Sequence, residues 1–198
     1  MQKGDIFDVF KDYKFLLLVF ALTSTMIPLY FTESTLPLML QKNHDNAQYI
    51  FGTIVTITTL MSIILQIFIS KFSKRFGYIK SIILGQFLTI LVFIVIPILK
   101  NDISLIGIFM ILSIGEMLTS LSSNLLIVDN CKEGNIGKYM SIGKLRVFLA
   151  LSISAAIGGY FINNNAIQMC MLTYSGLSLF GIVTLFLLKN SINDTSRK

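Results

Sequence analysis

Charged residues are scarce in this sequence. Only 13% of its 198 residues are Asp, Glu, Lys or Arg, whereas 54% are hydrophobic. A soluble globular domain typically carries about 25% charged residues, so this composition excludes an ordinary soluble domain. Lys and Arg outnumber Asp and Glu by 16 to 10, but they lie in short segments between apolar runs rather than along a polar face. This pattern argues against nucleic-acid binding and indicates orientation in a membrane.

Histidine and cysteine are rarer still. The single histidine, His44, lies in a predicted loop, and no Ser–His pair or metal-ligand cluster falls within an apolar run. We therefore expect no enzyme activity, no metal and no other cofactor. Cys131 lies in a predicted loop and Cys170 within an apolar run, and they form no CxxC pair. We expect both to be free thiols.

Long apolar runs, by contrast, fill almost the whole chain. A bilayer core about 30 Å thick requires roughly 20 apolar residues in each spanning helix. The sequence has six such runs, at about residues 15–40, 49–70, 79–99, 104–128, 142–162 and 167–188. The polar breaks between them are short, so neighbouring helices must run antiparallel. The predicted fold class is an all-α membrane protein, a bundle of six transmembrane helices over residues 15–188.

The basic residues predict how the bundle is oriented. Loops rich in Lys and Arg stay in the cytoplasm. With the N-terminus inside, fourteen of the 16 basic residues lie on the inner side, and only Lys42 and Lys100 lie outside. We therefore predict a multi-pass protein of the cell membrane, with a cytoplasmic N-terminal segment at 1–14 and a cytoplasmic tail at 189–198.

Polar stripes mark four of the six spans. A helix in contact with lipid alone gains nothing from polar side chains, so a stripe at helical spacing predicts a face toward protein or water. The clearest stripes are Gly52, Thr56, Thr59, Ser62 and Gln66 in the second span, and Ser113, Glu116, Ser120 and Ser123 in the fourth. The first and fifth spans carry similar residues, whereas the third and sixth are mostly apolar and are expected to be peripheral. This order indicates two three-helix repeats, the arrangement in which transporters build a central site. The alternative is that these small residues only allow close packing.

Two acidic residues, Glu33 and Glu116, fall within apolar runs. Placing an acid in the hydrocarbon costs roughly 2.5 to 3.5 kcal/mol, so each calls for a reason. Because burial disfavours the charged form of a carboxyl group, either residue could carry a proton at physiological pH. In the ionised form they could instead attract a cationic substrate. The structural alternative is a protonated Glu that is hydrogen-bonded to a neighbouring helix.

The loop after the second span, Ser70–Lys80, resembles the pattern GxxxDRxGR[RK]. Arg75 and Gly77 stand at its Arg and second Gly, and Lys80, one residue farther along, is taken as its final basic residue. This pattern is the loop motif of a known family, the major facilitator superfamily. Ser70 stands at the first Gly of the pattern and Lys74 at the Asp. The resemblance is to the second six-helix half of the drug:proton antiporters of that family.

Three further segments extend this resemblance over nearly the whole chain. Residues 31–38, with a Leu-Pro pair, are similar to the family's seventh helix. Residues 115–116 together with 137–140 resemble the tenth helix and the loop after it. Residues 150–159 are similar to the antiporter pattern GxxxGPxxGG, with Ala155 in place of the Pro.

The resemblance implies half of the major facilitator fold, in which helices one and four of each half line a central cavity. It implies a membrane transporter, or half of one, that carries out proton-coupled secondary active efflux of small, cationic or amphipathic compounds by alternating access. The substrate- or proton-binding residues expected on this basis are Glu33, Glu116, Thr56, Thr59, Ser62, Gln66, Ser120 and Asn124.

The partners expected are the lipid bilayer, protons, a small-molecule substrate and a second six-helix half. Residues 1–14 look like the end of the linker that joins two halves, so the second half would be a separate chain, a missing N-terminal half or a second copy in a homodimer. The alternative function is a membrane protein that binds a partner without transport, or an inactive remnant of a truncated transporter.

Overall fold

The computed structural model describes residue 10 and residues 12–99, 101–131 and 135–193, with side chains as far as residue 188. The predicted terminal segments lie largely outside these residues, as do Lys100 and Lys132. All regular structure in the described part of the chain is helical. Six helical stretches are long and apolar enough to cross a membrane: Tyr13–Asn43, Ala47–Phe76, Tyr78–Ile98, Asp102–Asp129, Ile136–Asn163 and Ile167–Leu188. The prediction of an all-α, six-helix membrane bundle is confirmed.

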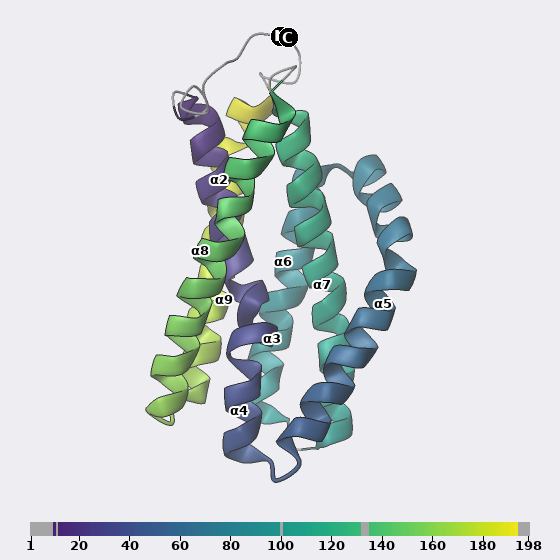
Figure 1. Ribbon diagram of the computed structural model, residues 1–198, viewed down its shortest axis with the longest axis vertical. Helices are drawn as coiled ribbons and strands as arrows, with labels where there is room; N and C mark the ends of the chain where they lie inside the picture. Colours follow the sequence, from purple (N-terminus) through teal and green to yellow (C-terminus); the bar gives the residue numbers. More distant parts are fainter. Residues whose placement is uncertain (1–9, 11, 100, 132–134, 194–198) are drawn as a thin grey trace.

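The first span is broken into four short segments. They are α2 (Tyr13–Met26), the 3-10 turn η1 (Ile27–Tyr30), α3 (Phe31–Ser34) and α4 (Leu36–Asn43). Pro28 and Pro37 each stand in the first turn of the segment after a break, where a missing N–H loses no helical hydrogen bond. The breaks place α3 about halfway along the bundle, where it packs against α8 (Figure 1).

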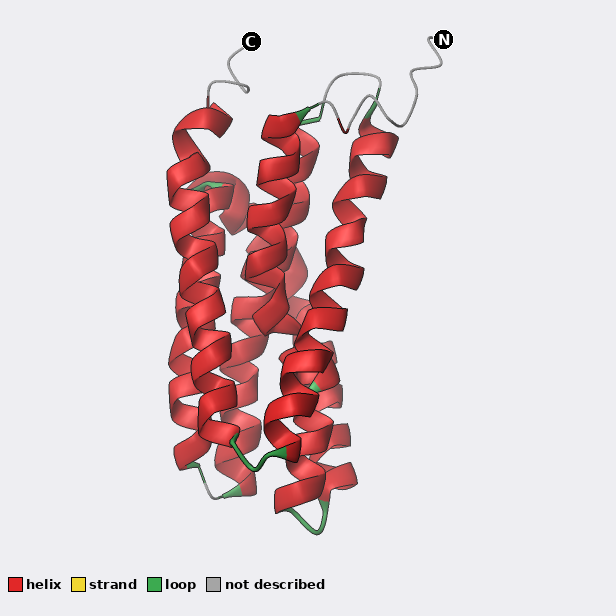
Figure 2. Cartoon of the chain, turned by 90° about the vertical axis from the view of Figure 1, so that its left-hand side faces the viewer, coloured by secondary structure: helices red, strands yellow, loops and turns green. Residues whose placement is uncertain are grey.

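The other spans are long, nearly continuous helices. They are α5 (Ala47–Phe76), α6 (Tyr78–Val95) with the short turn η2 (Ile96–Ile98), α7 (Asp102–Asp129), α8 (Ile136–Asn163) and α9 (Ile167–Asn193). They stand roughly side by side along one axis (Figures 1 and 2). Gly77 separates α5 from α6 with a φ of 101°, a backbone conformation that side-chain-bearing residues rarely adopt. The glycine of the predicted loop motif is therefore required by the turn.

Small residues allow α6 and α7 to pack backbone against backbone. A Cβ atom added at Gly85 would lie 2.6 Å from the carbonyl oxygen of Gly115 and 2.5 Å from Oγ1 of Thr119. Beside this crossing, Gln86 donates to Oγ1 of Thr119 at 3.2 Å and to the carbonyl oxygen of Thr25 at 3.0 Å. Close approach and interhelical hydrogen bonds are the main sources of cohesion between helices in lipid, where burial of apolar surface gives no net gain.

A second cluster ties the broken first span to α8 and α9. The hydroxyl of Tyr174 donates to the carbonyl oxygen of Ser154 at 2.8 Å and lies 2.7 Å from Oγ1 of Thr35. Gly158 faces Thr35 so closely that any Cβ atom there would overlap it. The break after α3 is thus held in place by side chains from two other spans.

Burial differs sharply between the helices. In α5 only 11% of the most apolar stretch is buried, whereas in the third span the fraction is 50%. The third span was expected to be peripheral, but in this bundle it packs along α7 and α9. The close approach of α6 and α7 at Gly85 and Gly115 explains why the third span is not peripheral. A largely apolar helix can be an inner helix where its neighbour presents small residues.

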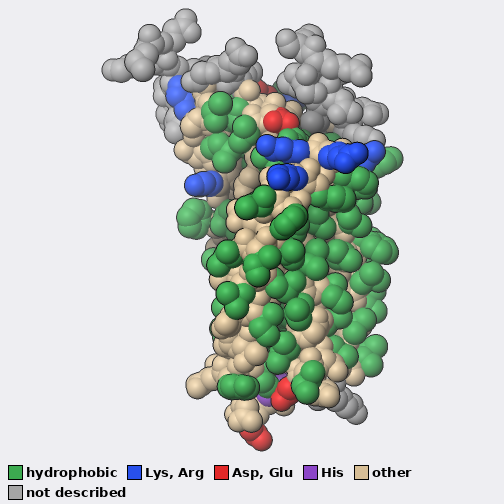
Figure 3. Space-filling model, turned by 90° about the vertical axis from the view of Figure 1, so that its right-hand side faces the viewer, with side chains coloured by type: hydrophobic (Ala, Val, Ile, Leu, Met, Phe, Trp, Pro, Cys, Tyr) green, Lys and Arg blue, Asp and Glu red, His purple; other side chains and the backbone are tan. Residues whose placement is uncertain are grey.

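Hydrophobic and charged side chains are distributed over the surface of the bundle as in a membrane protein. Figure 3 shows one face that is largely hydrophobic along its length, with Lys and Arg side chains gathered at one end. Lys71, Lys74 and Arg75 close α5 at that end. The chain is therefore a multi-pass membrane protein.

Candidate functional site

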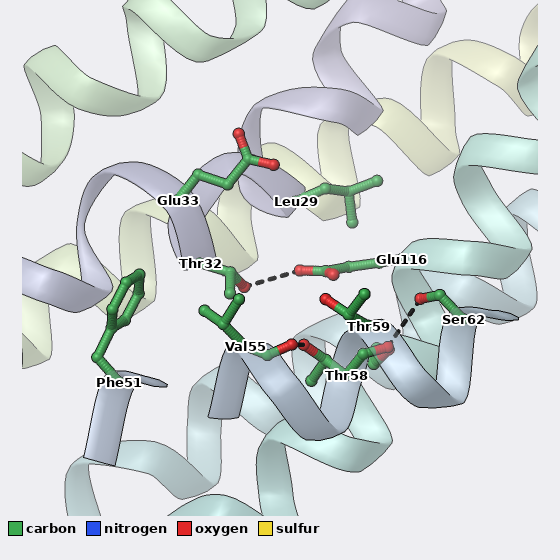
Figure 4. Close-up of a pocket in the computed structure, with 10 residues that line it drawn as sticks. Leu29, Thr32, Glu33, Phe51, Val55, Thr58, Thr59, Ser62 and Glu116 are labelled. Carbon is green, nitrogen blue, oxygen red and sulfur yellow. Dashed lines mark hydrogen bonds between the residues drawn. The ribbon is translucent and has the colours of Figure 1, made fainter. Parts of the chain in front are cut away.

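A cavity of about 270 Å³ lies between the broken first span, α5 and α7. It is close to the middle of the bundle, and Figure 4 shows the side chains that converge on it. Its lining residues are Leu29, Thr32, Glu33, Phe51, Val55, Thr58, Thr59, Ser62, Ser113 and Glu116. Most of them are polar, which is unusual for a space inside an apolar bundle.

Glu116 joins two sides of this cavity. Its side chain extends from α7 toward α3, where Oε1 accepts a hydrogen bond of 2.8 Å from the hydroxyl of Thr32 (Figure 4). Glu116 is half-buried, and no ion pair is found for it among the described residues. A carboxyl group held by one neutral hydroxyl can gain or lose a proton without breaking a salt bridge.

Glu33 lines the same cavity from its rim. It is exposed in this bundle, and in Figure 4 its carboxyl group is turned away from α5. Tyr30, three residues and so about one turn earlier in the broken span, is close enough to Glu33 and Glu116 for the charge of each to act on it. The two acidic groups therefore belong to one electrostatic neighbourhood, although they do not touch.

The α5 side of the cavity is built from hydroxyl groups. Ser62 donates to the carbonyl oxygen of Thr58 at 2.8 Å, and Thr58 donates to the carbonyl oxygen of Val55 at 3.2 Å. Hydroxyls that bond back to their own helix keep their lone pairs free to accept further hydrogen bonds. Thr59 has no partner among the described residues. This wall can therefore accept hydrogen bonds from a ligand.

Four of the eight predicted site residues line this cavity: Glu33, Thr59, Ser62 and Glu116. The other four do not. Thr56 lines a separate shallow groove on the outer side of α5, and Gln66 is exposed one turn beyond Ser62. Ser120 is half-buried and Asn124 exposed farther along α7. On α5 the predicted stripe covers two adjacent helix faces. Each residue is rotated by about 100° around the helix axis from the one before, so Thr56 lies to one side of the face that lines the cavity.

Two polar cavity residues, Thr32 and Thr58, belong neither to the predicted site nor to a polar stripe described from the sequence. Thr58 stands four residues before Ser62, a spacing that places both on one helix face. Thr32 lies in the broken part of the first span, where regular helical spacing does not apply. The sequence therefore held a signal for Thr58, whereas Thr32 depends on a break that spacing cannot locate.

Arg146 was counted with the basic residues of the inner loops, but it lies in the interior of the bundle. It is 2% exposed, and its Nη2 donates to Oδ1 of Asn124 at 2.6 Å. The sequence contained a signal for this position. Arg146, Ala150, Ser154 and Gly158 follow one another at intervals of four, and all four are buried on one face of α8.

The loop motif lies at the end of α5, away from the cavity. Arg75 and Lys80 are exposed, and Nζ of Lys80 lies 5.8 Å from the ring centroid of Phe76. This distance is within the range of a cation–π contact. The motif therefore shapes the turn between α5 and α6 and does not contribute to the cavity.

A family model described as Major Facilitator Superfamily matches residues 15–198. The matched range includes all six spans except the first two residues of the first, and it includes every residue of the cavity and Arg146. A search of the curated proteins found no match.

Proposed function

Because this chain belongs to the major facilitator superfamily, a family of membrane transporters, we propose that it carries out proton-coupled efflux of small cationic or amphipathic compounds. The observation that supports this proposal most is the cavity that places Glu116 in the middle of the bundle. An ionisable group at such depth commonly marks a substrate or proton path.

In the proposed cycle, a proton and the cationic part of the substrate compete for Glu116. The ionised carboxylate accepts the hydroxyl hydrogen of Thr32 and attracts the cation. When Glu116 takes up a proton, that attraction is lost and the compound is released. One carboxyl group thus couples the two movements, because it cannot hold both partners at once.

The remaining lining residues suit an amphipathic ligand. Leu29, Phe51 and Val55 provide apolar surface, and the hydroxyls of Thr58 and Thr59 provide hydrogen-bond acceptors. Ligand sites in proteins generally combine an apolar lining with a few converging polar groups. Phe51 could also face a cation with its ring.

We further propose that a second six-helix half packs against α5 and α8. Both helices present small or polar side chains at the surface, including Gly52 and Thr56 on α5 and Ser152 and Ala155 on α8. Such residues gain little from lipid but allow another helix to approach closely. Alternating access needs two halves that rock about a common site. The second half would be another chain or a second copy of this one.

Competition between proton and cation can be tested on the purified chain in lipid nanodiscs. Tetraphenylphosphonium is added in weakly buffered solution, and proton release is followed with a pH indicator dye. We expect the cation to bind and to displace about one proton per bound ion, because both partners use Glu116.

The test compares Glu116→Gln with a matched control, Asp45→Asn. Asp45 is exposed in the loop between α4 and α5, so its substitution should leave proton release unchanged. Glu116→Gln should abolish proton release while the variant keeps its helical circular dichroism spectrum. Undiminished proton release in Glu116→Gln would refute the proposed role of this carboxyl group.

A further inference from the structure

Arg146 is a buried cation without a counter-charge. Among the described residues, Nη2 donates to the side-chain oxygen of Asn124, and Nε and Nη1 have no partner. The guanidinium group is always protonated at physiological pH, so it cannot relieve the cost of burial by losing its proton. A buried charge that is neither paired nor fully hydrogen-bonded calls for an explanation.

The described bundle does not supply the missing anion. The other buried polar side chains in this part of the chain are neutral residues, namely Ser, Thr and Gln. Glu116 is bonded to Thr32, and no ion pair joins Arg146 to a described acidic residue. The positive charge therefore serves something outside these contacts.

Arg146, on α8, contacts the same polar face of α7 that lines the cavity. Glu116, Ser120 and Asn124 are spaced by four residues, so they lie close to one face, and eight residues rise about 12 Å along a helix. Tyr30 interacts electrostatically with Arg146 as well as with Glu116. The guanidinium group thus lies at one end of a polar row and the cavity carboxyl group at the other.

The position of Asn124 allows a ligand to reach Arg146. Its side chain is exposed, whereas the guanidinium group that it contacts is buried. A ligand that approaches along this face can take the place of the Asn124 amide and reach Nη2. An anionic oxygen would form a stronger hydrogen bond there than the neutral amide does, because both partners are charged.

We propose that Arg146 binds the anionic group, a phosphate or a carboxylate, of the transported compound. This inference rests on the proposed function and refines its substrate class. The compound then carries an anionic oxygen at the Arg146 end and a cationic or apolar part toward Glu116. The substrates would be zwitterionic or anionic amphipathic molecules, and a simple lipophilic cation such as tetraphenylphosphonium would occupy the Glu116 end alone.

The probe is butyl phosphate, and butanol serves as its neutral match. The thermal unfolding temperature of the purified chain is measured in nanodiscs of zwitterionic phosphatidylcholine. Saturating butyl phosphate should raise it by about 3 °C, and butanol should not. A second set of nanodiscs with phosphatidylglycerol tests whether a lipid phosphate supplies the same chemistry. Stabilisation by either source supports an anion site and identifies the source.

Three variants decide whether Arg146 is responsible. Arg146→Gln should remove the shift with butyl phosphate, and Arg146→Lys should keep part of it. Asn124→Asp places a carboxylate next to Nη2, so it should stabilise the ligand-free chain and abolish the shift. This last variant gives an answer even if Arg146→Gln fails to fold.

The inference is overturned if butyl phosphate and phosphatidylglycerol both leave the unfolding temperature unchanged, or if the shift persists in Asn124→Asp. Its failure is distinguishable from that of the proposed function. A phosphate shift without cation-linked proton release would retain the anion site and remove the coupling by Glu116. Cation-linked proton release without a phosphate shift would retain the coupling by Glu116 and remove the anion site at Arg146.

Discussion

At the scale of single residues, the hydroxyl of Tyr174 is a clear case of a side chain that organises the bundle. It bonds to the carbonyl oxygen of Ser154 and lies within hydrogen-bond distance of Thr35, so it connects α9 to α8 and to the break in the first span. The group is buried, so water cannot replace these bonds. Loss of the hydroxyl should therefore lower the stability of the bundle.

We predict that Tyr174→Phe lowers the free energy of unfolding by about 1 kcal/mol, because a buried carbonyl and a buried hydroxyl lose a partner. Tyr160→Phe is the matched control. Tyr160 is 67% exposed, and this substitution should change stability by less than about 0.5 kcal/mol. Unfolding in mixed micelles, followed by circular dichroism, measures both. Equal effects of the two substitutions would contradict the role given to Tyr174.

At the residue level, the sequence was most informative about position where helical spacing was regular, while the binding roles of these residues stay a prediction. Glu116 and Ser62 were assigned to one polar space, and both line the cavity. The environment of Arg146 was missed because a basic residue close to a loop fits the rule that positive charge stays in the cytoplasm. That rule concerns the side of the membrane, and it cannot tell an exposed Arg from one turned into the bundle.

At the scale of helices, the crossing of α6 and α7 depends on glycine. The two backbones approach at Gly85 and Gly115 so closely that no side chain fits between them. We predict that Gly85→Ala forces the helices apart and destabilises the bundle by about 1 to 3 kcal/mol. Helix content should be kept, because alanine favours the helix itself.

Gly107→Ala is the control for this prediction. An added Cβ atom at Gly107, also within a membrane-spanning helix, would meet no other atom within 4 Å. The control should leave stability unchanged or increase it by up to about 1 kcal/mol. A Gly85→Ala variant as stable as Gly107→Ala would show that the crossing is looser than described.

Helix number and order could be predicted from the sequence because apolar runs and polar breaks report directly on membrane thickness. The breaks of the first span could not be placed to the residue, although Pro28 and Pro37 mark them. Proline shows where a helix can be interrupted, but the actual path depends on neighbours such as Tyr174 and Gly158. Those contacts are long-range in sequence and leave no local pattern.

At the scale of the whole molecule, two polar regions lie along one side of α7. Glu116 and the hydroxyls of α5 line the cavity, whereas Asn124, two turns farther along α7, bonds to Arg146 of α8 outside it. The exposed small residues of α5 and α8 are consistent with a second half that would enclose this face. That half stays a prediction from the family resemblance, whereas the unpaired charge of Arg146 is seen only in the contacts of the described residues.

The central claim is that Glu116 faces a hydrated space and not lipid. Its most direct test is the reaction rate of Glu116→Cys with a water-soluble, cationic methanethiosulfonate in a background without Cys131 and Cys170. Phe87→Cys, on an exposed apolar face of α6, is the lipid-facing comparison, and Ser62→Cys repeats the test on the α5 wall. Thiols in water form the reactive thiolate, whereas thiols in lipid do not.

We predict that Glu116→Cys and Ser62→Cys react at least about ten times faster than Phe87→Cys, since a difference of 1.4 kcal/mol in ionisation already gives that ratio. If the two cavity positions react as slowly as Phe87→Cys, they face lipid and not water, which would contradict the claim that Glu116 lies in a hydrated space.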